Sequence, residues 1–187
     1  AAGIVIAPVL IVGLWGARFI ARWVEKKPHT FSVGAAAFAC TIAAPWILIL
    51  VNATAGRWLT FYLPMIETLA AMVIAYAFGE GIGRLACISF GCCYGKPLAQ
   101  CPPAIRRIFR RRHFIFRGKT KKISYASQME GVEMVPVQAL TALICTLTGL
   151  LSFYLFLKGQ AAMALVLTLF ATQSWRFVSE FLRADYR

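Results

Sequence analysis

Acidic residues and histidine are scarce in this 187-residue chain. It contains seven Asp and Glu and two His against 20 Lys and Arg, and only 14% of its residues are charged. Hydrophobic residues make up 60% of the sequence. A soluble domain of this size has too little interior to bury that much apolar surface, whereas a helical membrane protein exposes it to lipid. The composition therefore excludes an ordinary soluble domain.

Internal repeats, low-complexity tracts and a secretory signal pattern are also absent from the sequence. Long apolar runs are present instead. A helical span needs about 20 mostly apolar residues, and the sequence offers five such runs, at 3–20, 31–51, 59–79, 137–157 and 161–178. Lipid-facing backbone has no water to bond, so all five are predicted to be helices. The sequence begins without a methionine, so we expect that further spans could be missing from this sequence.

We therefore predict an all-α polytopic membrane bundle, with a single transmembrane domain over residues 1–187 and a basic extramembrane loop at 96–136. The positive charge is distributed unevenly across the predicted spans. Of the 20 Lys and Arg, only Arg57 and Lys158 fall on the side of the N-terminus and the second and fourth loops. The positive-inside rule then predicts that the basic loop and the nearby Arg84 are cytoplasmic. We expect a multi-pass protein of the bacterial cytoplasmic (inner) membrane.

The end of the third apolar run is the most informative segment. Glu80 precedes Arg84 by four residues, which is the favourable order for an ion pair on a helix. A charge at membrane depth is costly and usually faces a partner or a polar cavity. Glycines at 79, 81 and 83 are expected to open a groove beside the pair. The pair is part of a functional site or a structural clasp, or else Arg84 simply extends to the membrane interface.

A second ion-pair pattern occurs near the C-terminus. Arg176 and Glu180 repeat the four-residue spacing in reverse order, and Arg183 falls on the same helix face. Two arginines from different helices can clamp a phosphate, because guanidinium matches its geometry bidentately. The alternative is an interfacial helix end with snorkelling basic side chains.

Four of the six cysteines, Cys87, Cys92, Cys93 and Cys101, lie within 15 positions. On the cytoplasmic side they are expected to stay reduced. Cys87 and Cys92 are candidate catalytic thiols, since a neighbouring Arg84 favours the reactive thiolate. They are otherwise small apolar fillers or metal ligands. The spacing C-x4-C-C-x7-C matches no common zinc or iron–sulfur pattern, so we predict no metal and no cofactor.

The basic loop carries nine positive residues between positions 105 and 122, interleaved with phenylalanines. Residues 105–116 are predicted to form a surface helix. Nucleic acid is a conceivable partner, but beside membrane spans the anionic lipid headgroups are nearer, so we predict a lipid partner and no nucleic acid. The alternative is a topological anchor. The two histidines, His29 and His113, lie in polar loops and receive no role.

Four segments resemble, in order, the motifs of the prolipoprotein diacylglyceryl transferases. The central one comprises Glu80–Cys87 and the Gly-Cys-Cys-Tyr-Gly run at 91–95, and it is similar to a divergent branch of that family. Gly16–Phe19 resembles the family's Gly-Ala-Arg-Leu element. Val135–Gln138 resembles its His-Pro-x-Gln element, and Arg176–Arg183 its late Arg-Phe-x-x-Glu-Phe-x-Arg element.

The resemblance implies an all-helical membrane bundle with a lateral lipid entrance. The family transfers a diacylglyceryl group from phosphatidylglycerol to a lipoprotein cysteine. Arg84, Arg176 and Glu180 match its functional positions, which suit binding of an anionic phospholipid and stabilisation of charge as the phosphate leaves. Close approach of the lipid phosphate is expected over Gly83, Gly91 and Gly95. We expect the catalytic set to comprise Arg84 and Glu180, which match the family, and Cys92 and Cys87, which stand near Arg84 at positions where the family has other polar residues.

The sequence departs from the family at its acid–base residues. Two family histidines correspond to Ser32 and Val135, an asparagine to Cys87, and two glutamates to Cys92 and Thr141. The family's site also faces outward, whereas the charge distribution predicts a cytoplasmic one.

We therefore expect a transferase acting on a glycerophospholipid, with altered catalytic residues and a protein acceptor that contains a cysteine. The alternative is a catalytically silent lipid-binding subunit with a partner membrane protein. A thiol-redox or metal-binding subunit is the third interpretation.

Overall fold

The computed structural model describes residues 2–24 and 33–184. Its regular structure is almost entirely helical, and five helices are long and apolar enough to cross a membrane. This confirms the predicted all-α polytopic class. The chain groups into two compact units, residues 1–69 and 70–187, and the single transmembrane domain over residues 1–187 stays a prediction. The start of the second predicted span, with Ser32, lies outside the described residues, as does His29.

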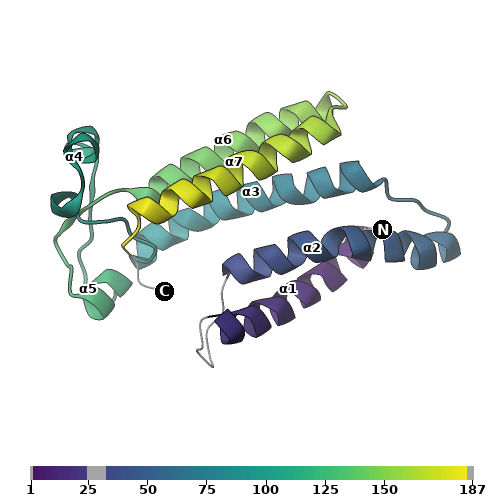
Figure 1. The fold of residues 1–187 in the computed structure, drawn as a ribbon, viewed down its shortest axis with the longest axis horizontal. Coiled ribbons are helices and arrows are strands. Elements are labelled where there is room, and N and C mark those ends of the chain that lie inside the picture. Colours follow the sequence, from purple (N-terminus) through teal and green to yellow (C-terminus); the bar gives the residue numbers. More distant parts are fainter. Residues whose placement is uncertain (1, 25–32, 185–187) are drawn as a thin grey trace. The chain divides into compact units, whose positions relative to one another are not determined.

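The N-terminal unit contains two helices that lie side by side, α1 (Ala2–Val24) and α2 (Val33–Val51) (Figure 1). Small residues bring the two backbones together. A Cβ at Gly13 would lie 2.4 Å from Sγ of Cys40, and one at Gly16 would lie 2.5 Å from Cβ of Ala39. Close approach at small residues is how helices gain contact in lipid, where no hydrophobic force drives them together.

The third long helix is displaced from its predicted place. A short π-helical turn, η1 (Asn52–Gly56), follows α2, and α3 runs from Met65 to Phe90 where we predicted 59–79. Residues before a proline avoid helical geometry, and α3 begins directly after Pro64. The Asn52 side chain holds the preceding segment through bonds of 2.8 and 3.0 Å to the backbone of Leu63.

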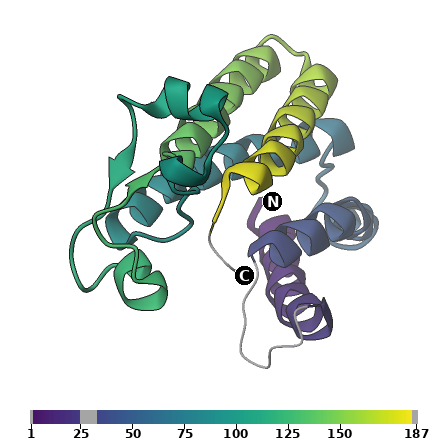
Figure 2. The ribbon, with the colours of Figure 1, turned by 60° about the vertical axis from the view of Figure 1, so that its left-hand side comes forward.

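The C-terminal unit packs α3 from residue 70 onward beside α6 (Val137–Leu157) and α7 (Ala161–Leu182), as both ribbon views show (Figure 2). The hairpin of α6 and α7 closes in a turn at Lys158–Gln160. Its second helix is longer than the predicted 161–178. Two glycines allow α3 and α6 to approach, since Gly81 lies against Thr146 and Gly149 lies against the ring of Phe78.

The loop between α3 and α6 folds into a small polar cap. Its elements are η2 (Leu98–Gln100), α4 (Pro103–Phe109), β1 (Phe114–Ile115), α5 (Lys122–Ser127) and β2 (Glu133–Met134), with β1 and β2 antiparallel. The predicted helix over 105–116 is therefore too long. Phe114 and Phe116 both pack on the core formed by Tyr94, Ile123 and Met134, and a strand places alternate residues on one face.

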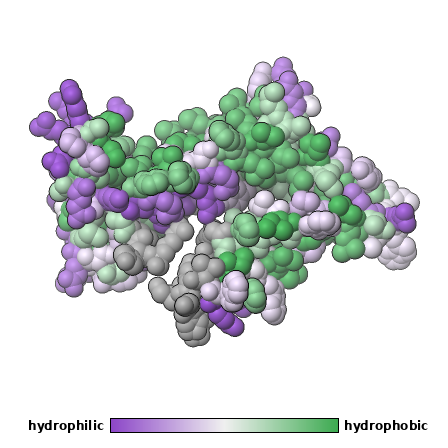
Figure 3. Space-filling model, in the orientation of Figure 1, coloured by the Kyte–Doolittle hydropathy of each residue, from purple (hydrophilic) through white to green (hydrophobic). Residues whose placement is uncertain are grey.

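The surface divides as a membrane protein requires. In Figure 3, apolar side chains cover the long helices of the C-terminal unit, and hydrophilic ones gather at the end that carries α4. Leu147, Leu151 and Phe170 are examples of exposed apolar residues on these helices. The arginines of α4 and of the turn that follows it are exposed to solvent.

Candidate functional site

An extended segment, Tyr94–Pro97, joins the three motif regions of the C-terminal unit. The Lys96 amide donates a 2.8 Å bond to the carbonyl of Leu182 at the end of α7, and the Lys96 carbonyl accepts a 3.1 Å bond from the Val135 amide. A Cβ at Gly95 would lie 2.3 Å from the Val135 carbonyl oxygen, so only glycine fits there. This segment therefore lies between the last residue of α7 and the residues that precede α6, and its backbone hydrogen bonds hold both in place.

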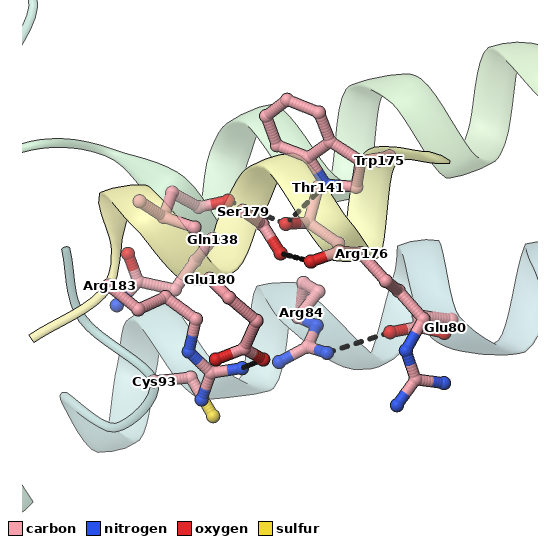
Figure 4. Close-up of a pocket in the computed structure, with 11 residues that line it drawn as sticks. Glu80, Arg84, Cys93, Gln138, Thr141, Trp175, Arg176, Ser179, Glu180 and Arg183 are labelled. Carbon is pink, nitrogen blue, oxygen red and sulfur yellow. Dashed lines mark hydrogen bonds and ion pairs between the residues drawn. The ribbon is translucent and has the colours of Figure 1, made fainter. Parts of the chain in front are cut away.

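A pocket lies at this end of the three helices (Figure 4). Its lining comes from α3, α6, α7 and the Gly-Cys-Cys-Tyr-Gly segment, and comprises Glu80, Arg84, Cys93, Val137, Gln138, Thr141, Trp175, Arg176, Ser179, Glu180 and Arg183. Arg84, Arg176 and Glu180, which two separate motifs contribute, therefore line one pocket. The prediction that Arg84 and Arg176 meet across one cavity is confirmed.

A chain of hydrogen bonds connects the two arginines. Nη2 of Arg84 lies 2.7 Å from Oε1 of Glu80, and the Tyr76 hydroxyl donates to the other oxygen of the same carboxylate. Nη1 of Arg176 donates a 2.8 Å bond to that hydroxyl. Spacing of four residues puts Tyr76, Glu80 and Arg84 on one face of α3. The Glu80 and Arg84 side chains are only 8% and 20% exposed, so the ion pair is largely buried.

The opposite part of the pocket holds a looser pair. Nη1 of Arg183 lies 3.7 Å from Oε1 of Glu180; the arginine is buried, and the glutamate is 57% exposed. In Figure 4 the carboxylate of Glu180 lies on the same side of the pocket as the guanidinium of Arg84. The lining thus carries three guanidinium groups and two carboxylates, which leaves it positive and suited to an anion.

Sequence reasoning missed three polar residues of this site. Tyr76 shares the spacing of Glu80 and Arg84, and that spacing is the signal that could have identified it. Gln138 donates a 2.9 Å bond to the Cys92 carbonyl, and within the described residues its Oε1 is buried without a hydrogen-bond partner. Trp175 donates a 2.9 Å bond to the Thr141 hydroxyl, and thereby joins α7 to α6.

The cysteines of the central motif converge, which their spacing did not predict. The sulfur atoms of Cys87, Cys92 and Cys93 all lie within 4.8 Å of one another. Gly91 ends α3 with φ +62°, and the Cys92 amide returns to the Cys87 carbonyl at 3.1 Å. Cys93 has φ +53°, which is uncommon for a residue with a side chain. These two left-handed positions turn the chain back onto the end of α3.

The three thiols differ in their surroundings. Cys93 lines the pocket, whereas Cys87 and Cys92 lie outside its lining. Burial raises the pKa of the Cys92 thiol, although a hydrogen bond with Cys87 acts in the opposite direction. This opposes the hypothesis that Arg84 keeps Cys92 as a thiolate. Cys101 lies outside the cluster, with its sulfur 3.4 Å from the Pro97 carbonyl oxygen.

The glycines predicted to contact lipid divide into two kinds. Gly91 and Gly95 are buried in the packing of the cap and lie outside the pocket lining. Gly83 faces open space, since a Cβ there would meet no atom within 4 Å, and Gly79 is similar. Gly81 packs against α6, so the predicted groove does not extend over all three alternating glycines.

Val135 and Thr141, two positions at which the sequence predicted a departure from the family, are held in structural contacts. Val135 is fully buried in an apolar cluster with Leu98, Cys101 and Val137. The Thr141 hydroxyl donates to the Val137 carbonyl at 2.7 Å while it accepts from Trp175. Neither side chain supplies a group that titrates near neutral pH.

Comparison with known families identifies one match. The family model described as prolipoprotein diacylglyceryl transferase matches residues 6–187, almost the whole chain. No curated protein sequence and no solved structure matches the chain. The family and the five apolar helices together indicate a multi-pass membrane protein. The motifs that meet at the pocket and the length of this match lead to one conclusion: the chain belongs to the prolipoprotein diacylglyceryl transferase family.

Proposed function

We propose that this protein is a transferase of the bacterial cytoplasmic membrane that moves the glyceryl-lipid group of an anionic phospholipid to a cysteine of a protein acceptor. The observation that carries the proposal is the bonded series Arg84–Glu80–Tyr76–Arg176, of which Arg84, Glu80 and Arg176 line the pocket. It holds two guanidinium groups from different helices in fixed positions, as a phosphate clamp requires.

The pocket chemistry suits a phosphate that leaves with negative charge. A guanidinium carries five N–H donors in a fixed fork, so Arg176 can hold Tyr76 and still bind phosphate oxygens. Donors fixed in advance stabilise charge that develops in the transition state without reorganising at that moment. Arg84 and Arg176 are the proposed phosphate-binding residues. The exposed carboxylate of Glu180 is the proposed acceptor of the proton from the attacking thiol.

The open helix surface at Gly83 is the proposed path of the lipid chain toward Arg84, since no side chain covers that position within 4 Å. The arginines of α4 are exposed, and we propose that they contact lipid headgroups at the membrane surface and attract anionic lipid. Under this proposal phosphatidylglycerol is the donor, and the replaced acid–base residues mean that its activation differs from the family's.

A catalytically silent lipid-binding subunit is the second candidate. It is favoured by Val135, which is fully buried and apolar at a position where the family has histidine. A protein of this kind would keep the phosphate clamp and lose proton transfer. It would then present bound lipid to a partner membrane protein.

The test is a transfer assay in nanodiscs that contain acyl-labelled phosphatidylglycerol and a peptide with a single cysteine. The unmodified protein is expected to move label to the peptide, and Arg84→Gln and Arg176→Gln are each expected to abolish transfer. Lys158→Gln is the matched control, because it removes one positive charge at the α6–α7 turn, away from the pocket.

The outcomes separate the two candidates. The silent subunit would be established if lipid co-purifies with the unmodified protein, is lost from the Arg84 and Arg176 variants, and is not transferred to any cysteine peptide. If both arginine variants still bind lipid and still transfer it, both candidates are contradicted.

A further inference from the structure

The three clustered thiols form a second site that the phosphate clamp does not use. Cys87 lies in the last turn of α3, and Cys92 and Cys93 follow the turn at Gly91. The arrangement is held from outside as well: Gln138 on α6 holds the Cys92 carbonyl, and the Gly91 carbonyl accepts a 3.0 Å bond from the Ile123 amide. Three sulfur atoms therefore converge on a loop that two other parts of the unit hold in place.

The spacing of the sulfur atoms is close to that of a metal site. With a zinc–sulfur bond of about 2.3 Å and tetrahedral angles, ligand sulfurs lie about 3.8 Å apart. The observed separations are at most 4.8 Å, so a contraction of about 1 Å or less completes the geometry. Side-chain rotation of cysteine supplies such a shift without movement of the backbone.

The local charge favours a divalent ion. Three thiolates around Zn²⁺ carry one net negative charge, and Arg84 lies close enough to Cys87 and Cys93 to interact electrostatically with both. Cuprous ion, which thiolates also select, would leave two negative charges beside the same arginine, and three once an acceptor thiolate is bound, against two for zinc. Zinc with three protein ligands keeps a fourth position for a reacting group, as catalytic zinc sites do.

We propose that Cys87, Cys92 and Cys93 bind one zinc ion, and that its fourth position receives the cysteine sulfur of the acceptor. This inference rests on the proposed transferase function. Cys93 lines the pocket that holds Arg84, so an ion on these sulfurs lies at the pocket wall, within reach of a thiol brought to the bound lipid. The site would supply what the missing acid–base residues no longer can: an acceptor sulfur that is already deprotonated.

The chemistry balances. The acceptor thiol binds zinc as a thiolate and releases its proton, which Glu180 or water accepts. The sulfur then forms a bond to the glyceryl carbon of the lipid as the bond from that carbon to the phosphate oxygen breaks. The electron pair leaves with glycerol phosphate, whose charge Arg84 and Arg176 stabilise. The product is a thioether, and the zinc site returns to its starting state.

Metal binding is measured first, on full-length protein purified in detergent under a reducing, oxygen-free atmosphere. We expect one equivalent of zinc per chain, and one equivalent of added Co²⁺ with the absorption bands of cobalt–thiolate bonds. The single variants Cys87→Ser, Cys92→Ser and Cys93→Ser are each expected to lose the metal. Cys101→Ser, a buried cysteine outside the cluster, is the matched control and is expected to keep it.

The fourth position is tested with the cobalt-loaded protein and a cysteine peptide. Addition of the peptide is expected to raise the number of sulfur ligands from three to four by X-ray absorption, and a serine version of the peptide is expected to change nothing. Unmodified protein with reduced thiols and a native helical spectrum that binds neither zinc nor cobalt would overturn the proposal. Unchanged cobalt coordination on addition of the cysteine peptide would overturn the acceptor role.

These readouts do not depend on turnover. Metal binding and peptide coordination in a protein that transfers no lipid would support the site and contradict the transferase. Transfer that persists in the metal-free triple variant would support the transferase and overturn the zinc site.

Discussion

The hydroxyl of Tyr76 accepts a 2.8 Å hydrogen bond from Arg176, one hundred residues later in the sequence, while it donates its own hydrogen to Glu80. Through this one oxygen, the guanidinium of α7 is fixed relative to the Glu80–Arg84 pair of α3. The distance between the two arginines therefore depends on a residue that carries no charge.

Replacement of Tyr76 by phenylalanine tests this dependence. Tyr76→Phe keeps the ring but removes the hydroxyl, so Arg176 loses the hydrogen-bond acceptor that fixes its position. We expect affinity for phosphatidylglycerol to fall about tenfold, which corresponds to about 1.4 kcal/mol, as measured by lipid titration in detergent. Tyr154→Phe, at an exposed tyrosine of α6, is the control, and an equal effect of the two substitutions would contradict the prediction.

Local sequence could predict those interactions of the site in which both residues belong to the same helix. The Glu80–Arg84 pair follows from four-residue spacing on a helix. The meeting of Arg84 with Arg176 required the family motifs, because spacing along one helix says nothing about which face a second helix presents. Tyr76 was missed because a tyrosine within an apolar run usually serves packing or an interface.

The convergence of the cysteines could not be predicted from their spacing. It depends on a left-handed conformation at Cys93, which residues other than glycine seldom adopt, and on the brace that Gln138 supplies from another helix. The predicted start of α3 was wrong for a different reason. Apolar residues precede Pro64, so hydrophobicity alone extended the span backward, and the proline determines where the helix begins.

Gly95 is expected to tolerate no side chain. Gly95→Ala places a Cβ 2.3 Å from the Val135 carbonyl oxygen and 2.8 Å from a methyl group of Val137. Such overpacking typically costs about 1–3 kcal/mol, so thermal unfolding in detergent should begin at a lower temperature. Gly79→Ala is the matched control, since its Cβ meets nothing within 4 Å, and alanine is favoured over glycine in a helix by about 1 kcal/mol. Equal stability of the two variants would refute the packing argument.

Gln138 is expected to have two roles: to hold the loop at Cys92 and to bind the lipid headgroup. Gln138→Leu removes the donor to the Cys92 carbonyl, and leaving a buried acceptor unpaired costs about 1–3 kcal/mol. Gln138 lines the pocket, and its buried Oε1 has no hydrogen-bond partner among the described residues, so we expect this oxygen to accept a hydrogen bond from a headgroup hydroxyl. The substitution should therefore reduce the preference for phosphatidylglycerol over phosphatidic acid in lipid titrations.

The control for this substitution is Gln100→Leu, at an exposed glutamine of η2. It is expected to change neither stability nor lipid preference. An unchanged ratio of the two lipid affinities in Gln138→Leu, with lowered stability, would restrict Gln138 to holding the loop.

The orientation of the pocket is the last prediction, because charge and family point in opposite directions. Lys158 lies in the turn that joins α6 to α7, whereas the cap that carries Arg110 is tied to the far end of α7 by the 2.8 Å bond between Lys96 and Leu182. The topology predicted from the sequence puts only two of the 20 Lys and Arg on the side of Lys158, so the positive-inside rule predicts a cytoplasmic cap. In intact cells, an impermeant maleimide is expected to label Lys158→Cys above the background of the unmodified protein, and to label Arg110→Cys only after the membrane is opened. The reverse pattern would mean that the pocket faces outward, as the family's does, and that the exposed arginines of α4 are held there by anionic headgroups against the usual charge rule.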